Sequence, residues 1–426
     1  MEVLRYGSTG AEVLLLQLAL KRGRYYWGEL DGIFGTRTLN AVRRFQTARG
    51  LAPDGVAGPL TFASLEPWLL GALKVVLRPG DTFFKLARRY GTSTEAVLAA
   101  NPGLEPTALP VGTEVTVPLG FDLVPCGVPF SSKLTEYAVR GLALRYPFIS
   151  AGSIGSSVLG KSIASLEMGS GERRVFLSAA YHANEWITTP LALSFIEGYS
   201  KAYITGGSIG GIEASALFER ARLFAVPLVN PDGVDLVTGA LPISSAAYRG
   251  AVAIAEDYPG IPFPEGWKAN IAGTDINLNF PADWELAREI KFALGFTGPA
   301  PRDYVGSSPL SAPEARAVYD HTVNNDFDLV LAYHTQGEVI FWRYKDIEPA
   351  GAEDIAERLA EVSGYALENV PDESANAGYR DWFILQYDRP GYTVEAGRGA
   401  NPLPVEQLAE IKSANFPLIA EALALV

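Results

Sequence analysis

Three histidines occur among the 426 residues, and one of them has an acidic residue three positions later. His182 and Glu185 lie in "AAYHANEW", directly after the apolar stretch "RRVFLSAA" (173–180). His334 ends a second apolar stretch, "DFDLVLAYH" (326–334). Two imidazoles and one carboxylate are the protein ligands of many catalytic zinc sites, which keep a fourth position for water. An H-x-x-E pair alone is a weak signal, so its meaning depends on where the fold places it.

Glu395 lies near the end of a third apolar stretch, "PGYTVEAG" (390–397). If these stretches are buried strands of one sheet, their polar residues lie at the carboxyl ends of strands, where α/β sheets place their sites. A carboxylate at that position can act as general base toward a metal-bound water. His321 is a contrasting case, because it lies within a helical pattern and not at a strand end; we expect a surface histidine or one that packs within the helical layer.

Residues 133–426 alternate apolar stretches typical of strands with longer amphipathic ones typical of helices. This alternation predicts a three-layer α/β domain with a mixed or largely parallel sheet. Besides the three stretches above, "ARLFAVPLVN" (221–230) is expected to be a strand. The expected helices cover residues 189–204, 311–323, 351–365 and 405–425.

The first 70 residues contain an internal repeat. "DGIFGTRT" (31–38) and "DGVAGPLT" (54–61) share Asp-Gly-x-x-Gly-x-x-Thr, a pattern typical of a turn followed by a capped helix. Amphipathic stretches lie before and between them, so residues 1–70 are expected to form a small all-α domain. The full pattern resembles the type-1 peptidoglycan-binding family across residues 3–66.

Residues 73–119 show the order strand, helix, helix, strand. Thr92 or Ser93 is the expected cap of the second helix, and "GTEVTVPL" (112–119) alternates as a short strand does. The segment resembles the LysM domain, a βααβ module that binds glycans containing N-acetylglucosamine. Residues 120–132, rich in proline and glycine, are expected to be a linker.

The composition is that of a soluble globular protein, with 48% hydrophobic and 19% charged residues. No apolar run is long enough for a spanning helix, and the first residues show no secretory signal. The single cysteine, Cys126, excludes an intrachain disulfide. Of the net charge of −13, residues 1–120 contribute 13 − 10 = +3 and the remainder 22 − 38 = −16. An acidic body argues against nucleic acid or an anionic membrane as partner.

Four further segments extend the pattern begun by H-x-x-E. In chain order they are "NPDGVDLV" (230–237), "GTDINLNFPADW" (273–284), "AYHTQGEVIFW" (332–342) and "AGYRDWFI" (377–384). In this order they resemble the zinc carboxypeptidase family over residues 133–426. The resemblance implies an eight-stranded mixed sheet flanked by helices. It also implies one Zn²⁺ per chain, held by His182, Glu185 and His334, with Glu395 as general base and then general acid.

The departures from the family pattern concern substrate recognition. The usual D-x-N-R-N reads D-I-N-L-N, so Asn277 is kept but the arginine that holds a terminal carboxylate is Leu278. The family's oxyanion arginine has no clear counterpart; Lys268 is the nearest cation and Arg249 a more remote one.

Two residues of "AGYRDW" complete the expected substrate-binding set. Tyr379 is the candidate to replace the family's catalytic tyrosine, which has no match at its usual spacing. Arg380 lies in the segment that shapes the specificity pocket in this family, where a cation suits a carboxylate on the leaving side. An arginine that only pairs with Asp381 at the surface is the alternative.

Together with the two wall-binding modules, these departures resemble the γ-D-glutamyl-L-diamino acid endopeptidases. That subgroup cuts the γ-D-glutamyl–meso-diaminopimelate bond of peptidoglycan stem peptides. Peptidoglycan glycan strands and stem peptides are then the expected partners, and the cell wall or the spore is the expected location. A carboxypeptidase that releases terminal residues and a catalytically inactive wall-binding protein are the alternatives.

Overall fold

The chain folds into two compact units, described here from a computed structural model that covers residues 3–370 and 375–426. The first unit contains Met1–Val128 and Glu136–Ile149. The second contains Pro129–Thr135 and Ser150–Val426. No helix in the described ranges has both the length and the apolar character needed to cross a membrane.

The first unit begins with three helices, as expected for residues 1–70: α1 (Ala11–Arg22), α2 (Thr36–Ala48) and α3 (Pro59–Leu70). The buried side chain of Gln17 in α1 holds the first repeated turn. Its amide nitrogen donates to Asp31 Oδ1 at 2.7 Å, to the Ile33 carbonyl at 3.1 Å and to Thr38 Oγ1 at 3.1 Å. Its amide oxygen accepts from Gly32 N at 3.0 Å.

Gln46 in α2 makes the same set of bonds to the second turn. Its amide nitrogen donates to Asp54 Oδ1 at 2.8 Å, to the Val56 carbonyl at 3.0 Å and to Thr61 Oγ1 at 3.3 Å. Its amide oxygen accepts from Gly55 N at 2.9 Å. The repeat in the sequence is therefore a repeat of one buried hydrogen-bond network, with a glutamine from the preceding helix at each centre.

The second part of this unit has the expected βααβ order. An antiparallel pair, β1 (Ala72–Val76) and β2 (Glu114–Pro118), encloses α4 (Phe83–Tyr90) and α5 (Thr94–Ala99). Ser93 caps α5 by accepting from Ala96 N, which decides between the two caps expected from the sequence.

The segment expected to be a linker, residues 120–132, is packed in place. Leu123 is buried, and Arg145 of α6 (Ser132–Arg145) donates to the Leu119 and Phe121 carbonyls at 2.9 Å each. Arg145 also donates to the Gly71 carbonyl at 2.9 Å. A buried arginine that binds three carbonyls fixes the path of the chain after β2.

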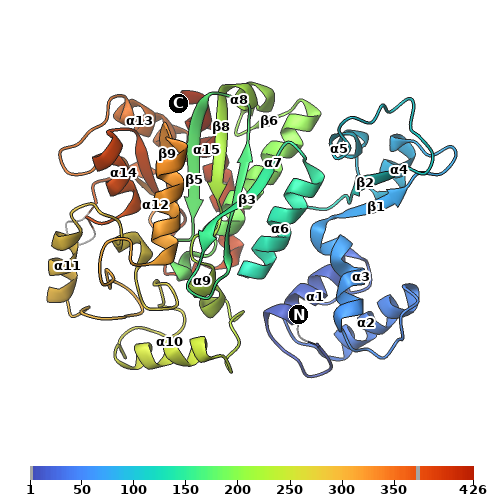
Figure 1. Ribbon diagram of the computed structural model, residues 1–426, viewed down its shortest axis with the longest axis horizontal. Helices are drawn as coiled ribbons and strands as arrows, with labels where there is room; N and C mark the ends of the chain where they lie inside the picture. The colour runs from blue at the N-terminus through green and yellow to red at the C-terminus, as the bar shows by residue number, and fades with distance from the viewer. Residues whose placement is uncertain (1–2, 371–374) are drawn as a thin grey trace. The chain divides into compact units, whose positions relative to one another are not determined.

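The second unit contains an eight-stranded mixed sheet, which confirms the expected fold class (Figure 1). The strand order is β11-β10-β12-β9-β5-β8-β4-β3. Three neighbouring pairs in the middle, β12–β9, β9–β5 and β5–β8, are parallel. In chain order the strands are β3 (Ser150–Ser156), β4 (Ser162–Met168), β5 (Arg173–Ala179), β8 (Ala221–Val226), β9 (Leu329–His334), β10 (Val339–Phe341), β11 (Ala366–Leu367) and β12 (Gly391–Glu395).

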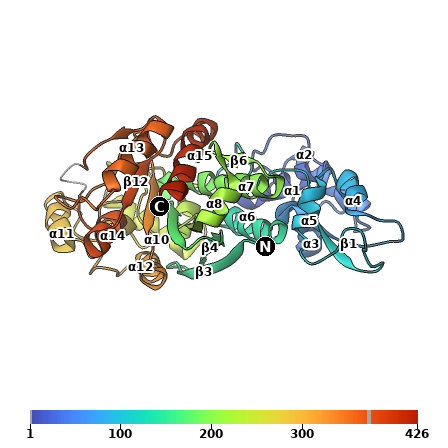
Figure 2. The same ribbon diagram turned by 90° about the horizontal axis from the view of Figure 1, so that it is seen from above.

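Helices cover both faces of this sheet, as Figures 1 and 2 show. One layer contains α7 (Thr188–Thr205), α13 (Ala352–Ser363) and α15 (Leu408–Leu425). The opposite face packs against α12 (Pro313–Asn325) and α14 (Tyr379–Tyr387) through one apolar cluster. Because successive side chains of a strand face opposite layers, strands covered on both sides are apolar throughout, which is the pattern seen in the sequence.

Shorter elements complete the second unit. They are β6 (Ser208–Ile209), β7 (Ile212–Glu213), α8 (Ala214–Arg220), α9 (Pro231–Val237), α10 (Ala246–Glu256) and α11 (Trp284–Ala293), with 3-10 turns at Ala183–Glu185, Ile276–Leu278 and Val405–Gln407. The turn at Ala183–Glu185 directly follows His182, and the turn at Ile276–Leu278 carries Asn277.

We expect Gln46→Ala to destabilise the first unit. The substitution leaves the buried Gly55 N–H without its acceptor and Asp54 without one donor, at a cost of about 1–3 kcal/mol in the free energy of unfolding. Urea titration followed by proteolysis within residues 1–70 measures the loss in the full chain. Gln386→Ala, at an exposed position of α14, is the matched control and should change nothing. Equal resistance of the two variants to proteolysis would contradict the role given to Gln46.

Candidate metal and catalytic site

The strand register brings the expected site residues to one edge of the sheet. Glu395 and His334 are direct partners at the ends of the parallel strands β12 and β9. Ala179, the last residue of β5, pairs with Tyr333, so His182 follows three residues beyond that level. Neighbouring strands lie about 4.8 Å apart, so the three side chains share one small region.

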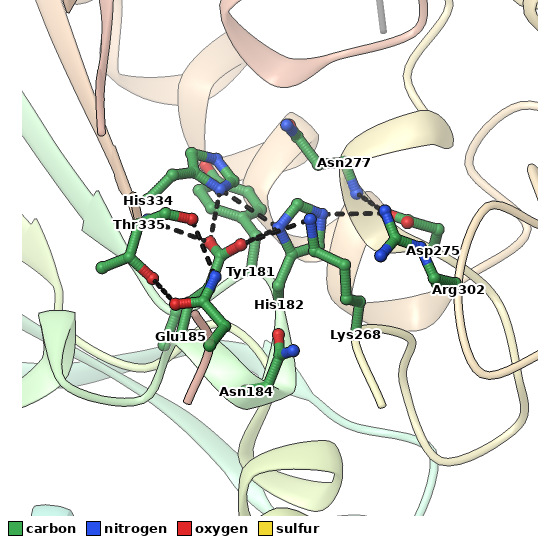
Figure 3. Close-up of polar contacts among 12 residues, drawn as sticks. Tyr181, His182, Asn184, Glu185, Lys268, Asp275, Asn277, Arg302, His334 and Thr335 are labelled. Carbon is green, nitrogen blue, oxygen red and sulfur yellow. Dashed lines mark hydrogen bonds and ion pairs between the residues drawn. The ribbon is translucent and has the colours of Figure 1, made fainter. Parts of the chain in front are cut away.

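The ligand atoms of His182, Glu185 and His334 all lie within 4.8 Å of one another. His182 Nδ1 is 2.9 Å from Glu185 Oε1, and His334 Nδ1 is 2.9 Å from Glu185 Oε2. The two Nδ1 atoms are 3.2 Å apart. All three side chains are buried. Figure 3 shows the two rings and the carboxylate pointing toward a common centre.

Asp275 sets the orientation of the His182 ring. Its Oδ1 lies 3.1 Å from His182 Nε2, and its Oδ2 accepts from Asp303 N at 3.1 Å. An ionised carboxylate only accepts hydrogen bonds, so His182 Nε2 carries a proton and Nδ1 is the ring nitrogen that faces the common centre. A carboxylate behind a histidine ligand is the arrangement that fixes the ligating tautomer in metal sites.

The surrounding backbone is held by local side chains. The Thr188 hydroxyl donates to the Glu185 carbonyl at 2.8 Å and accepts from Ala180 N at 3.0 Å, which closes the turn around His182. Asn230, from the "NPDG" segment, donates to the Tyr181 carbonyl at 3.1 Å. These bonds fix the direction in which the chain leaves β5.

His334 is fixed by packing. The Tyr181 ring stacks on its imidazole, with ring centroids 5.5 Å apart and an interplanar angle of 16°. The next residue, Thr335, donates its backbone N–H to Glu185 Oε2 at 3.4 Å and its hydroxyl to Asn401 at 2.7 Å. The ring therefore has one orientation, with Nδ1 toward Glu185.

This donor set fits a zinc ion. Ligand atoms around a tetrahedral zinc with bonds of 2.0–2.1 Å lie about 3.3 Å apart, close to the spacings here. Without a cation at the centre, the two Nδ1 atoms lie 3.2 Å apart and both are directed at the single carboxylate of Glu185. Two imidazole nitrogens and one carboxylate also match the ligand types of catalytic zinc sites.

The charges of the site are strongly coupled. Burial tends to raise the pKa of Glu185, but His182 and Lys268 lower it well below its usual range. Lys268 Nζ lies 3.4 Å from Glu185 Oε1. For Glu395, burial and the charge of Glu185 both raise the pKa, to about 8. A buried carboxyl group with a raised pKa is suited to take up and release a proton during a reaction.

A cavity of about 830 Å³ opens beside these groups. Of the substrate-binding residues expected from the sequence, Lys268, Asn277 and Arg380 line it, as does Glu395. The lining also includes Leu278, which packs with Trp284 and Ala287 in an apolar cluster and brings no charge to the wall.

Two of the residues named from the sequence do not line this cavity. Tyr379 does not line it, because its ring is fully buried among core aromatics and its hydroxyl bonds to Thr322 at 2.9 Å. Arg249, the remote candidate for an oxyanion cation, is exposed and donates to the Ser244 carbonyl. His321 packs between aromatic rings of the core, as expected, and burial lowers its pKa to about 4.

Arg380 is buried at the cavity wall, which excludes the alternative of a surface arginine beside Asp381. Its Nε and Nη2 both donate to Asp381 Oδ1, the former at 3.0 Å. Its Nη1 is buried and has no hydrogen-bond partner in the part of the chain that the structure describes. A charged donor without a partner at a cavity wall is suited to an anionic group of a ligand.

The sequence interpretation assigns no role to two residues of the site, Asp275 and Arg302. Asp275 belongs to the D-I-N-L-N segment, and its contact with His182 depends on a fold that brings residues 93 positions apart together. Arg302 lines the cavity beside Asp275 (Figure 3). It lies in a loop of no periodicity, and no motif in the sequence distinguishes it.

Family models match three parts of the chain. Residues 135–417 match the zinc carboxypeptidase family, residues 9–65 a putative peptidoglycan binding domain, and residues 75–118 the LysM domain. The first match covers about two thirds of the chain and includes every residue of the site described above.

Individual proteins agree with the family match. The chain is 42% identical to gamma-D-glutamyl-L-diamino acid endopeptidase 1 of Lysinibacillus sphaericus over 275 residues, 64% of this chain and 67% of that one. It is 39% identical to the uncharacterized protein YqgT of Bacillus subtilis over 297 residues, 69% and 77% of the two chains. The crystal structure of thrombin activatable fibrinolysis inhibitor shares the fold, with a TM-score of 0.53 at 18% identity over 71% and 77% of the chains. With its metal-ligand set, its sheet and its sequence in agreement, the chain belongs to the zinc carboxypeptidase family.

Proposed function

We propose that this protein is a zinc peptidase of cell-wall stem peptides that cuts the bond between a γ-linked D-glutamyl residue and a diamino acid. The proposal rests on the cationic side chains of the cavity wall, which differ in position from those of the family pattern. Leu278 removes the charge expected beside Asn277, and the buried Arg380 introduces one from another element. The endopeptidase of Lysinibacillus sphaericus, 42% identical over 275 residues, supports the choice of bond.

The proposed ligands of the zinc ion are His182, Glu185 and His334. When bound there, zinc lowers the pKa of water and polarises a carbonyl oxygen. Glu395, next to His334 in the sheet register, is the proposed general base that takes a proton from the attacking water and returns it to the leaving amine. Its raised pKa suits the second of these steps, because a protonated carboxyl group is the donor that a leaving amine needs.

Lys268 is the proposed stabiliser of the oxygen that becomes negative. Its ammonium group lies 3.4 Å from Glu185 and lines the cavity, so its positive charge is next to the ligand set. A fixed cation near the reacting carbonyl lowers the energy of the charged transition state more than that of the neutral substrate. Arg249, which is exposed and outside the cavity lining, has no part in this role.

The leaving side of the substrate is assigned to Arg380. A terminal carboxylate is best held by a charge-assisted pair of hydrogen bonds, and the apolar Leu278 cannot make them. The Nη1 of Arg380 is buried without a partner among the described residues, and a carboxylate of the diamino acid is the partner that we assign to it. The enzyme then selects a charged side chain within a peptide and does not require a chain end.

The first unit supports a role at the cell wall. Its matches to a peptidoglycan binding domain and a LysM domain fit glycan strands as the second partner. Binding an insoluble polymer beside the catalytic unit raises the effective concentration of stem peptides without any new contact in the active site. Association with the cell wall or the spore is the location that follows from this arrangement.

We expect one zinc ion per chain. His334→Ala should lose metal and activity together, and a chelator should lower the melting temperature, because an ion that binds only the folded state stabilises it. Elemental analysis, calorimetry and mass spectrometry of products from defined muropeptides measure the three effects. Cleavage that is unaffected by complete zinc removal would overturn the proposal. Full occupancy without any cleavage would instead identify an inactive wall-binding protein.

Glu395→Gln should keep the zinc ion and lose a factor of about 10²–10⁴ in kcat. The wild-type kcat/KM should fall as the pH decreases through the pKa of Glu395, because the base must be ionised. That acidic limb should be absent from the residual activity of the variant. A variant within a few fold of wild type that retains this limb would show that another group is the base.

Arg380→Leu should weaken cleavage of diaminopimelate peptides about 10–150-fold in kcat/KM, the usual value of a hydrogen bond to a charged group. Peptides with lysine in that position lack the extra carboxylate, so they should be poorer substrates of the wild type and respond little to the substitution. Arg288→Leu, at an exposed position of α11, is the control.

The same assays decide between internal and terminal cleavage. Amidation of the far carboxyl terminus should change the wild-type rate by no more than a few fold if Arg380 binds the diamino acid side chain. A large loss on amidation, reproduced by Arg380→Leu on every free peptide, would show that Arg380 binds a chain terminus. The protein would then be a carboxypeptidase.

A further inference from the structure

The cavity has cations on both sides of the proposed catalytic centre. The Cζ atom of Arg380 lies 5.9 Å from the ring centroid of Phe341, which belongs to β10. The strand order β10-β12-β9-β5 then gives Glu395, His334 and His182 in sequence from that side. The Arg380 guanidinium is therefore at the β10 end of this series, while the backbone before it contacts the Asn277 turn, because Tyr379 N donates to Asn277 Oδ1 at 3.1 Å.

On the other side of the centre, the next groups outward from His182 are Asp275 and Arg302. Its Nδ1 faces the other ligands, and its Nε2 faces Asp275. Asp275 in turn accepts the backbone N–H of Asp303, so the neighbouring Arg302 lies one step further out. Figure 3 shows the same succession from His334 through His182 and Asp275 to Arg302.

Arg302 has hydrogen-bonding capacity that the protein does not use. Its Nε donates to Asp303 Oδ2 at 2.6 Å, and its Nη groups have no hydrogen-bond partner among residues 3–370 and 375–426. The side chain is 43% exposed and lines the cavity. A planar guanidinium with free Nη donors matches the geometry of a carboxylate.

A simple surface ion pair with Asp303 does not account for this arrangement. Asp303 Oδ1 already accepts from Lys291 at 2.7 Å, and Lys291 is almost fully buried. One carboxylate is thus shared by two cations, so Asp303 alone does not neutralise Arg302, and Asp275 is the other acid of this part of the lining. Lys268, the other cation on this side, is next to Glu185 and is assigned to the reacting carbonyl.

We propose that Arg302 is a specificity-determining residue that binds a carboxylate on the acyl side of the scissile bond. This inference rests on the proposed function, in which Arg380 takes the leaving side. In a γ-linked glutamyl residue the side-chain carboxyl group forms the amide bond, so the α-carboxylate remains free and close to that bond. An α-linked peptide has no carboxylate at this place. Arg302 then selects γ-linked glutamyl substrates with a free α-carboxylate.

The test compares two substrates of nearly equal shape. One muropeptide carries γ-linked D-glutamate, and the other carries the same residue with its α-carboxylate converted to a carboxamide, which removes the charge. The wild-type enzyme should prefer the carboxylate about 10–150-fold in kcat/KM. Arg302→Gln should lose a similar factor on the carboxylate and at most a few fold on the amide, so that the preference disappears.

Two further variants, together with zinc content and melting temperature, separate a loss of recognition from structural damage. Arg302→Lys keeps the charge but loses the fork, so it should retain part of the preference. Arg249→Gln, at an exposed arginine outside the cavity lining, should behave as wild type. Zinc content and melting temperature should stay unchanged in all three variants, since none alters a ligand.

Three outcomes overturn the inference about Arg302. Equal wild-type rates on the two substrates would show that no group recognises the α-carboxylate, although the proposed function would stand. Equal losses on both substrates in Arg302→Gln would show that Arg302 acts on the reaction or on the structure. A preference for the carboxylate substrate that persists in Arg302→Gln would assign the carboxylate to another residue, and Lys268 would be the next candidate. Cleavage of neither γ-linked peptide by the wild type would instead reject the proposed function itself.

Discussion

The buried carboxylate of Glu185 is the constraint on which the site depends. Removing an ionised carboxylate from water costs several kcal/mol unless nearby charges and hydrogen bonds compensate for it. Here the compensation comes from the two histidines and Lys268, which reach Glu185 from three separate segments of the chain. The parallel strands β5 and β9, which lead to the two histidines, must therefore end at nearly the same level. The register of the sheet therefore determines whether the charged groups of the site can meet.

Outward from Glu185, acidic and basic groups alternate. His182 separates Glu185 from Asp275, and beyond Asp275 come Arg302 and Asp303. Such alternation allows many charges to be held in a small volume, because each carboxylate has a donor on two sides. It also explains how the cavity can lose one cation, at Leu278, and still present positive charge to a ligand. The charge is supplied from loops whose positions the sheet does not determine.

The site residues at or just after strand ends were predictable from sequence, whereas those on loops and helix starts were predictable only in part, since Arg380 lines the cavity and Tyr379 does not. His182, His334 and Glu395 end apolar stretches, and the fold places the end of a central parallel strand at the edge where sites form. Tyr379 and Arg380 differ, because they are the first residues of a helix and point about 100° apart. One faces the core and the other the cavity, and the sequence pattern does not distinguish them.

A substrate chosen by its side-chain charges, and not by its end, suits a polymeric target. In a cross-linked wall few peptides present the free terminus that an end-binding arginine requires, whereas charged side chains recur along the polymer. In the proposed function, the apolar Leu278 and the Arg380 Nη1, which has no partner among the described residues, change recognition in the same direction. The first unit, which matches a peptidoglycan binding domain and a LysM domain, would contribute in another way, by raising the local concentration of an insoluble substrate. In the proposed function, tethering and charge recognition are complementary: the first unit would select the polymer, and the cavity would select the bond.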